Sequence, residues 1–306
     1  MIHAAIIGMG VWGQNLVTSV QGLSQDIQFV AGATRTPAKA SEFAAKHKLR
    51  LLDSFEAVLA DPSIDAVVLA TPHSMHTEQI VAAAKAGKNV FCEKPLGLDR
   101  ASTQRAAQAA ADHNIILGVG YNWRYQPALQ EIRRMIDDGR LGKVLHIEGN
   151  FCGPSAYRFP KGHWRHASDE SPAGGMTGRG VHVIDAMMYL AGPIDRVTAQ
   201  SYRLAQDFGS DDTLWFRRHD LDDASFRRRF NRLFGHGHCH GRNLAHASFW
   251  FKWLGRGRRC QSLAYLGSHN LHDRPQQRDQ QAKASHDKLS SDQHRARRAR
   301  ALCRMH

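Results

Sequence analysis

The stretch that decides the fold is Ala4-Ala5-Ile6-Ile7-Gly8-Met9-Gly10-Val11-Trp12-Gly13, an apolar run that leads into a glycine-rich loop. The run predicts a buried strand, and the spacing of the glycines is typical of a turn from strand to helix. In such a turn Gly8 permits the bend, Gly10 lets the backbone approach a pyrophosphate, and Gly13 permits close helix–strand packing. The helix would begin at about Trp12 and point its positive end at the phosphates, so we expect Val11 and Trp12 to join the three glycines in contacting the cofactor. A dinucleotide site is therefore expected, the alternative being a chance cluster of glycines.

Strand and helix patterns alternate beyond this loop, which predicts an α/β fold with a doubly wound parallel sheet covered on both faces. The expected strands cover residues 3–7, 27–33, 66–70, 89–92 and 115–119, and the expected helices cover residues 12–20, 37–47, 77–86 and 101–112, with a further helix opening at Ser54. We expect a dinucleotide-binding domain over residues 1–120 and the start of a second α/β domain over residues 121–213. In the second domain the patterns predict helices at 126–138 and 181–190, strands at 144–151 and 196–202, and a loop at 152–179.

The end of the second expected strand bears on the choice of cofactor. A site for NAD usually places an acidic residue about 20 residues after the glycine loop, where it holds the ribose hydroxyls. This chain has Thr34 and Arg35 there and no acid. An arginine can pair with a 2′-phosphate, so we expect NADP, with NAD as the alternative. A solvated surface arginine would look the same in the sequence.

Two later motifs follow expected strands of the parallel sheet, whose carboxyl edge is where ligands bind. Thr71 and Pro72 follow the strand at 66–70 with His76 beyond them, and we expect all three to contact the cofactor, unless they only cap a helix. Glu93 and Lys94, in Glu93-Lys94-Pro95, follow the strand at 89–92, and we expect both to contact the cofactor as well. A partly buried lysine beside a nicotinamide would have a lowered pKa, suited to proton transfer, unless it merely pairs with Glu93.

The last candidate site residues are His182 and Asp185, in Gly180-Val181-His182-Val183-Ile184-Asp185. Residues three apart share one face of a helix, and a histidine oriented by a carboxylate is a ready general base. A helix-end pair without a role is the alternative. Together with Lys94, the pair favours catalysis.

Composition points to a cytoplasmic protein. No apolar run approaches the length of a membrane span, and the chain opens on a strand with no signal-like segment. The five cysteines form no paired framework, which suits a reducing compartment. We expect no membrane partner.

The net charge of +13 is confined to the end of the chain. Residues 213–306 hold 20 Lys and Arg against 7 Asp, and contain no Val, Ile or Glu. Strands are normally rich in Val and Ile, so no periodic element can be placed in this tail. It could be a disordered basic arm, a nucleic-acid-binding extension, or the product of a shifted reading frame. Because no aromatic residues interleave its last arginines, nucleic acid is not the expected partner. The histidines at 236–240 match no standard zinc spacing, so no metal site is expected.

These motifs together resemble the Gfo/Idh/MocA oxidoreductases, the family of glucose-fructose oxidoreductase and inositol dehydrogenase. The resemblance covers residues 1–213 and includes the glycine loop, Thr71-Pro72 with His76, Glu93-Lys94-Pro95, Tyr121-Asn122-Trp123-Arg124-Tyr125-Gln126-Pro127, Trp164-Arg165, Gly174-Gly175 and Gly180-Val181-His182-Val183-Ile184-Asp185. It implies a Rossmann domain, a second domain with an open and mainly antiparallel sheet, and homo-oligomers formed through that sheet. It also implies NAD(P)-dependent oxidation or reduction of sugars, cyclic polyols or related carbonyls. By resemblance, Lys94, His182 and Asp185 are catalytic, and Asn122, Arg124, Trp164, Arg165 and His182 contact the substrate.

Two departures from the family qualify this assignment. Many members have an Asp four residues before the histidine, where this chain has Gly178, so the usual Lys–Asp–His trio is incomplete. A non-catalytic NADP-binding regulatory relative is therefore the alternative function. The resemblance also stops at Asp211-Asp212-Thr213, where the composition changes. This coincidence favours the shifted reading frame, whose product would be inactive and whose second sheet would be incomplete, leaving oligomer formation in doubt.

Overall fold

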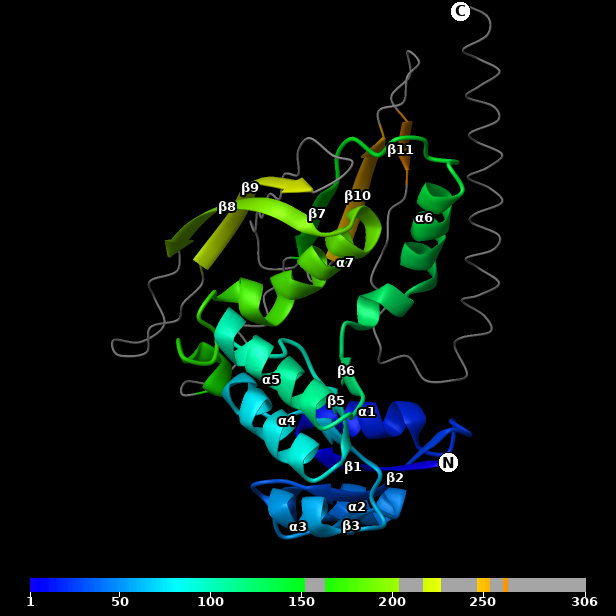
Figure 1. Cartoon of the computed structure of the whole chain (residues 1–306), viewed down its shortest axis with the longest axis vertical. Coiled ribbons are helices and arrows are strands. Elements are labelled where there is room, and N and C mark those ends of the chain that lie inside the picture. Colours follow the sequence, from blue (N-terminus) through cyan, green and yellow to red (C-terminus); the bar gives the residue numbers. More distant parts are fainter. Residues whose placement is uncertain (152–162, 204–216, 227–246, 254–260, 264–306) are drawn as a thin grey trace, which may run out of the picture. The chain divides into compact units, whose positions relative to one another are not determined.

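The computed structural model describes residues 1–151, 163–203, 217–226, 247–253 and 261–263 (Figure 1). Its first sheet has six strands in the order β3-β2-β1-β4-β5-β6, and every neighbouring pair is parallel. The strands are β1 (Ile2–Ile7), β2 (Ile27–Ala33), β3 (Arg50–Leu51), β4 (Ala66–Leu69), β5 (Asn89–Cys92) and β6 (Leu117–Val119). This order is that of a dinucleotide-binding Rossmann sheet, which confirms the predicted fold class.

Helices cover both faces of this sheet. They are α1 (Val11–Val20), α2 (Ser41–His47), α3 (Phe55–Ala60), α4 (His76–Lys85) and α5 (Arg100–Asp112), with short 3-10 helices η1 (Pro37–Lys39) and η2 (His73–Met75). Alternate residues of β1 point to opposite faces. Ala5 and Ile7 join a core under α3, α4 and α5, whereas Ala4 and Ile6 join a core under α1 and α2. The apolar run therefore has no polar face, as a strand buried on both sides requires.

Most predicted elements of this half are present, with differences at their ends. The helix predicted over residues 37–47 is instead η1 followed by α2, which are separated at Ala40. The two-residue strand β3 was not predicted, because so short a strand has no periodicity of its own. Ser54 caps α3 by accepting a hydrogen bond from the Ala57 amide at 3.1 Å, as its place before that helix predicts.

A second group of elements follows the sheet. It consists of η3 (Asn122–Tyr125), α6 (Pro127–Asp137), β7 (Glu148–Phe151), η5 (Trp164–His166), the π-helix η6 (Met176–Gly180), α7 (Val181–Ala191) and β8 (Ile194–Arg203). On α7 the buried residues Val183, Ala186, Met187 and Leu190 form a stripe at helical spacing. This stripe belongs to a separate core with Trp123 and residues of α6. The predicted loop over 152–179 differs from the structure, since η5 and part of η6 lie within it.

The remaining strands are antiparallel. β9 (Arg217–Phe226) pairs with β8, and β10 (Ala247–Trp253) pairs with both β7 and β11 (Gln261–Leu263). The sequence analysis placed no element after Asp212, so these three strands correct it. They contain no Val or Ile, and their pairing with β7 and β8 is a tertiary feature that β-propensity does not register. The domain boundaries and the three explanations of the tail stay predictions.

Candidate functional site

The glycine loop has the geometry that a bound pyrophosphate requires. Gly8 has a φ of +89°, and a Cβ there would lie 2.7 Å from the Ala70 carbonyl oxygen. A Cβ on Gly13 would lie 2.0 Å from the Gly8 carbonyl oxygen, whereas a Cβ on Gly10 would meet nothing within 4 Å. Gly8 and Gly13 are thus needed by the fold. Gly10 instead leaves open space at the N-terminus of α1, where no side chain caps the helix.

The remaining predicted cofactor residues of this region lie at the surface end of α1 and β2. The side chain of Val11 is 79% exposed at the first turn of α1. Arg35 is exposed just after β2, beside the half-buried Thr34, and has no hydrogen bond or ion pair with another described residue. Free amides at a helix N-terminus and an unengaged guanidinium fit a dinucleotide with its pyrophosphate and an added phosphate.

The first turn of α4 holds the loop that follows β4. The Thr71 hydroxyl donates to Gln79 Oε1 at 2.6 Å, and the Thr71 carbonyl oxygen lies 3.1 Å from His76 Nε2. His76 is completely buried, and its Nδ1 lies 2.8 Å from the Pro95 carbonyl oxygen. The structure therefore brings together the Thr71-Pro72 and Lys94-Pro95 segments, which the sequence predicted separately.

Glu93 is a buried carboxylate between the glycine loop and Lys94. Burial raises its pKa, while a hydrogen bond from the Trp12 side chain and the charge of Lys94 act against that rise. The Lys94 amide also donates to Glu93 Oε2 at 3.3 Å. Glu93 thus joins two predicted cofactor residues, Trp12 and Lys94, that are far apart in the sequence.

Lys94 reaches from the Rossmann sheet edge to the turn that precedes His182. Its ammonium donates to the Gly178 carbonyl oxygen at 2.9 Å. Gly178 belongs to the π-helix η6, and such wide turns frequently occur at functional sites. Burial lowers the pKa of Lys94, and the nearby Arg165 and Arg179 lower it further, whereas Glu93 raises it. The lysine is therefore easier to deprotonate than an exposed lysine.

His182 is enclosed by aromatic rings. It stacks on Trp123 at 5.1 Å between ring centroids, and Tyr121 meets it edge-on at 6.4 Å. Its Nδ1 is buried and has no hydrogen-bond partner among the described residues. Burial, followed by the charge of Lys94, lowers the pKa of His182 to about 3. The imidazole is therefore neutral at physiological pH.

Asp185 lies one turn beyond His182 but contacts a different residue. It accepts hydrogen bonds from Arg124 Nε at 2.8 Å and from Arg124 Nη2 at 2.6 Å. The predicted orientation of His182 by Asp185 is not what the structure contains. A guanidinium offers a carboxylate two parallel charge-assisted bonds, which an imidazole cannot match. The Arg124 guanidinium also lies over the Tyr189 ring at 5.6 Å.

The other predicted substrate residues lie on η3 and η5. Asn122 is exposed at the start of η3. The Arg165 guanidinium lies 4.2 Å over the Trp164 ring, and Trp164 meets the buried His73 edge-on at 5.0 Å. η2, which carries His73, is also joined to the chain after η5, because the Ser74 amide donates to Glu170 Oε2 at 3.0 Å. Arg165 is thereby held near Glu93 and Lys94, whose pKa values it affects.

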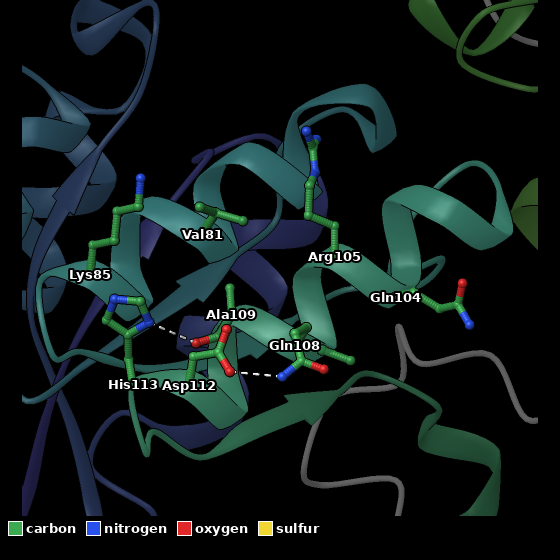
Figure 2. Close-up of a pocket in the computed structure, with 9 residues that line it drawn as sticks. Val81, Lys85, Gln104, Arg105, Gln108, Ala109, Asp112 and His113 are labelled. Carbon is green, nitrogen blue, oxygen red and sulfur yellow. Dashed lines mark hydrogen bonds between the residues drawn. The ribbon is translucent and has the colours of Figure 1, made fainter.

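A groove of about 740 Å³ lies elsewhere, between α4 and α5. Figure 2 shows Val81, Lys85, Arg105 and His113 around it, on the outer side of these helices. None of its lining residues is a predicted site residue. It is an open hollow between two helices and has no part in the chemistry considered below.

Several site residues were missed from the sequence. The Gly178 carbonyl, His73 and Glu170 contact segments far away in the sequence, for which the sequence carries no signal, and Gln79 contacts Thr71 at the start of the same loop and helix. Within the described residues, no group of three or more His, Cys, Asp or Glu could hold a metal ion. The histidines at 236–240 lie outside the described residues. No described helix is long and apolar enough to cross a membrane.

Comparison with known proteins follows the same two-part organisation. Residues 2–121 match the model of an oxidoreductase family with an NAD-binding Rossmann fold, and residues 129–227 match the GFO/IDH/MocA C-terminal domain. The second match continues past residue 213, so the resemblance extends further than the sequence analysis placed it. The added residues include β9.

The curated relatives that the chain matches include sugar and inositol dehydrogenases. Inositol 2-dehydrogenase of Rhizobium meliloti is 36% identical over 157 residues, covering 51% of this chain and 46% of that protein. Levoglucosan dehydrogenase of Pseudarthrobacter phenanthrenivorans is 33% identical over 146 residues, covering 47% of this chain and 37% of that protein. The chain therefore spans less than half the length of these two relatives.

Among solved structures, a levoglucosan dehydrogenase in complex with NADH and levoglucosan has a TM-score of 0.69 and 25% identity, covering 81% of this chain and 70% of that one. Scyllo-inositol dehydrogenase from Lactobacillus casei, with bound NAD(H) and scyllo-inositol, has a TM-score of 0.68 and shares the fold at 22% identity, covering 89% of this chain and 78% of that one. With both domain models matched in order over the described sheet and site, the chain belongs to the GFO/IDH/MocA family of oxidoreductases.

Proposed function

We propose that this protein is an NAD(P)-dependent oxidoreductase that transfers a hydride between the nicotinamide and a sugar, cyclic polyol or related carbonyl substrate. The observation that carries the proposal is the Lys94 side chain, which leaves the cofactor edge of the sheet and bonds to the turn before His182. A titratable lysine and a buried neutral histidine then face one reaction centre. Matched relatives that act on inositol and levoglucosan support the substrate class.

Lys94 is the better candidate for the proton-transfer group. A general base works best when its pKa lies near the working pH. The pKa of His182 is lowered to about 3, which makes its imidazole a weak base, whereas burial, Arg165 and Arg179 lower the pKa of Lys94 and so make it easier to deprotonate than an exposed lysine. Neutral Lys94 takes the substrate hydroxyl proton during oxidation and returns it during reduction. His182 steadies the oxygen from which that proton leaves.

The nicotinamide cofactor, when bound, supplies the hydride acceptor or donor. The residues present fit it, since Gly10 leaves room for a pyrophosphate and the N-terminus of α1 is uncapped. Glu93 fixes Trp12 and the lysine amide on the nicotinamide side. Asn122, Arg165 and Trp164 are placed to orient the substrate, and Asp185 holds Arg124 in position.

NADP is the proposed cofactor, with Arg35 as its 2′-phosphate partner. The Arg35→Ala variant is expected to raise the Kd for NADP by about tenfold, as loss of one charge-assisted contact would, and to leave the Kd for NAD within about twofold. Titration of both nucleotides by fluorescence measures this. Equal losses for both would indicate that Arg35 does not read the phosphate.

The first test of the whole proposal is a reaction panel. The full chain is incubated with NADP or NAD and a series of inositols, anhydrosugars and aldoses, and with keto-sugars or lactones in the reverse direction. Reduction or oxidation of the nicotinamide with at least one class is expected. Tight cofactor binding without turnover of any panel member would favour the non-catalytic regulatory relative, which the missing acid at Gly178 suggests.

A further inference from the structure

His76 holds a place in the fold that neither a cofactor contact nor a helix cap explains. Its side chain is fully buried, with 0% exposure. Nδ1 lies 2.8 Å from the Pro95 carbonyl oxygen and Nε2 lies 3.1 Å from the Thr71 carbonyl oxygen. Both ring nitrogens are therefore occupied by backbone, so the ring has no polar atom left for a ligand.

The two carbonyls belong to the two segments that the proposed chemistry needs. Thr71 follows β4, and Pro95 is the residue directly after Lys94. Gln79, one turn along α4 from His76, holds the Thr71 hydroxyl at 2.6 Å. The first turn of α4 thus contacts both oxygens of Thr71, and His76 in that turn also contacts the lysine segment.

We infer that His76 is a positioning residue, which acts on the reaction by holding the backbone after Lys94 to the first turn of α4. The inference rests on the proposed function, because it concerns the placement of the lysine that would transfer the proton. It assigns His76 a different role from the cofactor contact predicted from the sequence.

One of the two contacts does this positioning. A neutral imidazole has a single N–H and can donate to only one carbonyl. Burial lowers the pKa of His76, which favours that neutral form. We assign the N–H to Nδ1, because its contact with the Pro95 carbonyl oxygen is the shorter of the two, and this bond then restrains the lysine segment.

Substitution of His76 by an amide side chain tests the two contacts one at a time. Asn places its nitrogen near the position of Nδ1, and Gln places its nitrogen near that of Nε2. We therefore compare His76→Asn, His76→Gln and His76→Ala in the full chain. His113→Asn serves as the matched control, since His113 is an exposed histidine whose Nδ1 lies 3.0 Å from the Ala109 carbonyl oxygen.

Three quantities are measured for each variant. They are kcat and KM for the substrate found in the panel, the Kd of the nicotinamide cofactor, and the rate at which formaldehyde and cyanoborohydride methylate Lys94, followed by peptide mass spectrometry. His76→Ala is expected to lower kcat by about 10- to 100-fold through misplacement of the lysine, with the cofactor Kd changed less than about threefold. His76→Asn restores kcat and the Lys94 methylation rate to near those of the wild type, and His76→Gln does not. The control changes neither.

The opposite results are equally clear. A lower melting temperature in His76→Ala with unchanged kcat and unchanged Lys94 methylation would overturn the inference in favour of a merely structural role. Rescue by Gln rather than Asn would overturn the assignment to Pro95. If the Ala variant does not fold, the Asn and Gln variants alone decide. If the wild type turns over no substrate, the proposed function fails, but the methylation rates still show whether His76 positions Lys94.

Discussion

At the scale of single residues, Lys94 combines a partly buried ammonium, a cationic neighbourhood and one carbonyl partner. A lysine with a purely structural role would not need all three features. A lysine paired only with Glu93 would keep a high pKa, yet burial and the two arginines lower it here. Gly178 stands where many family members have an Asp, and its backbone carbonyl accepts a hydrogen bond from the Lys94 ammonium. The position therefore still contacts the lysine, although it has no side-chain carboxylate.

Replacing Lys94 separates proton transfer from binding. Lys94→Met is expected to lower kcat by about 10²- to 10⁴-fold, the usual contribution of a general acid or base. The cofactor Kd should change little. Lys94→Arg, which keeps the charge but does not titrate near neutral pH, should bind the cofactor as the wild type does and should not restore kcat. Steady-state kinetics with cofactor titration measures both, and a Met variant with kcat near that of the wild type would reject this role.

The buried histidines predict how stability depends on pH. Burial lowers the pKa of His73 to about 4 and that of His182 to about 3, both below the unfolded value of 6.5. Above pH 6.5 neither state binds the proton, so stability is unaffected. Below it the unfolded chain takes up protons that the folded chain refuses, and stability falls until the folded pKa is reached. The expected loss from pH 7 to pH 5 is about 2 kcal/mol for each histidine.

Urea unfolding of His73→Gln at pH 7 and pH 5 tests this. The variant should be less stable at pH 7, because the contact to the Glu170 carbonyl oxygen is altered. Its further loss between the two pH values should be about 2 kcal/mol smaller than that of the wild type. If His73→Gln lost as much stability between pH 7 and pH 5 as the wild type, His73 would not be the group that titrates. The same conclusion would follow if the control His113→Asn showed the same reduced loss.

At the scale of elements, the glycine loop separates folding from binding within one turn. Gly13→Ala would place a Cβ 2.0 Å from the Gly8 carbonyl oxygen, while Gly10→Ala would meet nothing. We expect Gly13→Ala to lower stability by about 1–3 kcal/mol through overpacking. Gly10→Ala should leave stability within about 0.5 kcal/mol and weaken cofactor binding by about tenfold, since its Cβ enters the pyrophosphate space. Thermal unfolding and fluorescence titration of both variants check this contrast.

Most elements of the Rossmann half could be predicted because their signals are local. β5 is bounded as predicted, and α4 and α5 begin one residue before their predicted starts. β7 is shorter than its alternating pattern, and η6 was read as loop, because the extent of pairing and the insertion of a wide turn depend on neighbours. β9 and β10 have no Val or Ile to signal them, and β10 pairs with β7 across a long interval of chain.

At the scale of the whole molecule, we expect the unusual tail to decide whether the full chain is soluble and stable. The Rossmann sheet has two buried cores of its own, whereas the described second-domain strands form sheets of only three and two strands. Sheets of so few strands expose unpaired edges. We therefore expect the full chain to be poorly soluble or unstable, while a chain cut after residue 120 still binds the cofactor. A single cooperative melt of the full chain, with an unfolding enthalpy far above that of the fragment, would contradict this.

The origin of the tail can be settled at the level of the gene. Sequencing the DNA across codons 205–306 and translating the other frames should yield Val- and Ile-rich strands if the frame is shifted. Since the family match reaches residue 227, the break should then lie beyond β9. Absence of such strands in every frame would make the basic tail genuine, and a salt-dependent binding to nucleic acid, lost on its removal, would become the test.

The sequence by itself determined the parallel sheet, the glycine loop and the candidate residues of the site, because apolar periodicity and turn chemistry act over a few neighbouring residues. Only the tertiary structure decided what those residues contact. Asp185 pairs with Arg124 rather than with His182, Lys94 bonds to a carbonyl 84 residues away, and His76 joins two loops instead of facing a ligand. Such contacts depend on which distant groups are buried together, and local sequence patterns do not encode that.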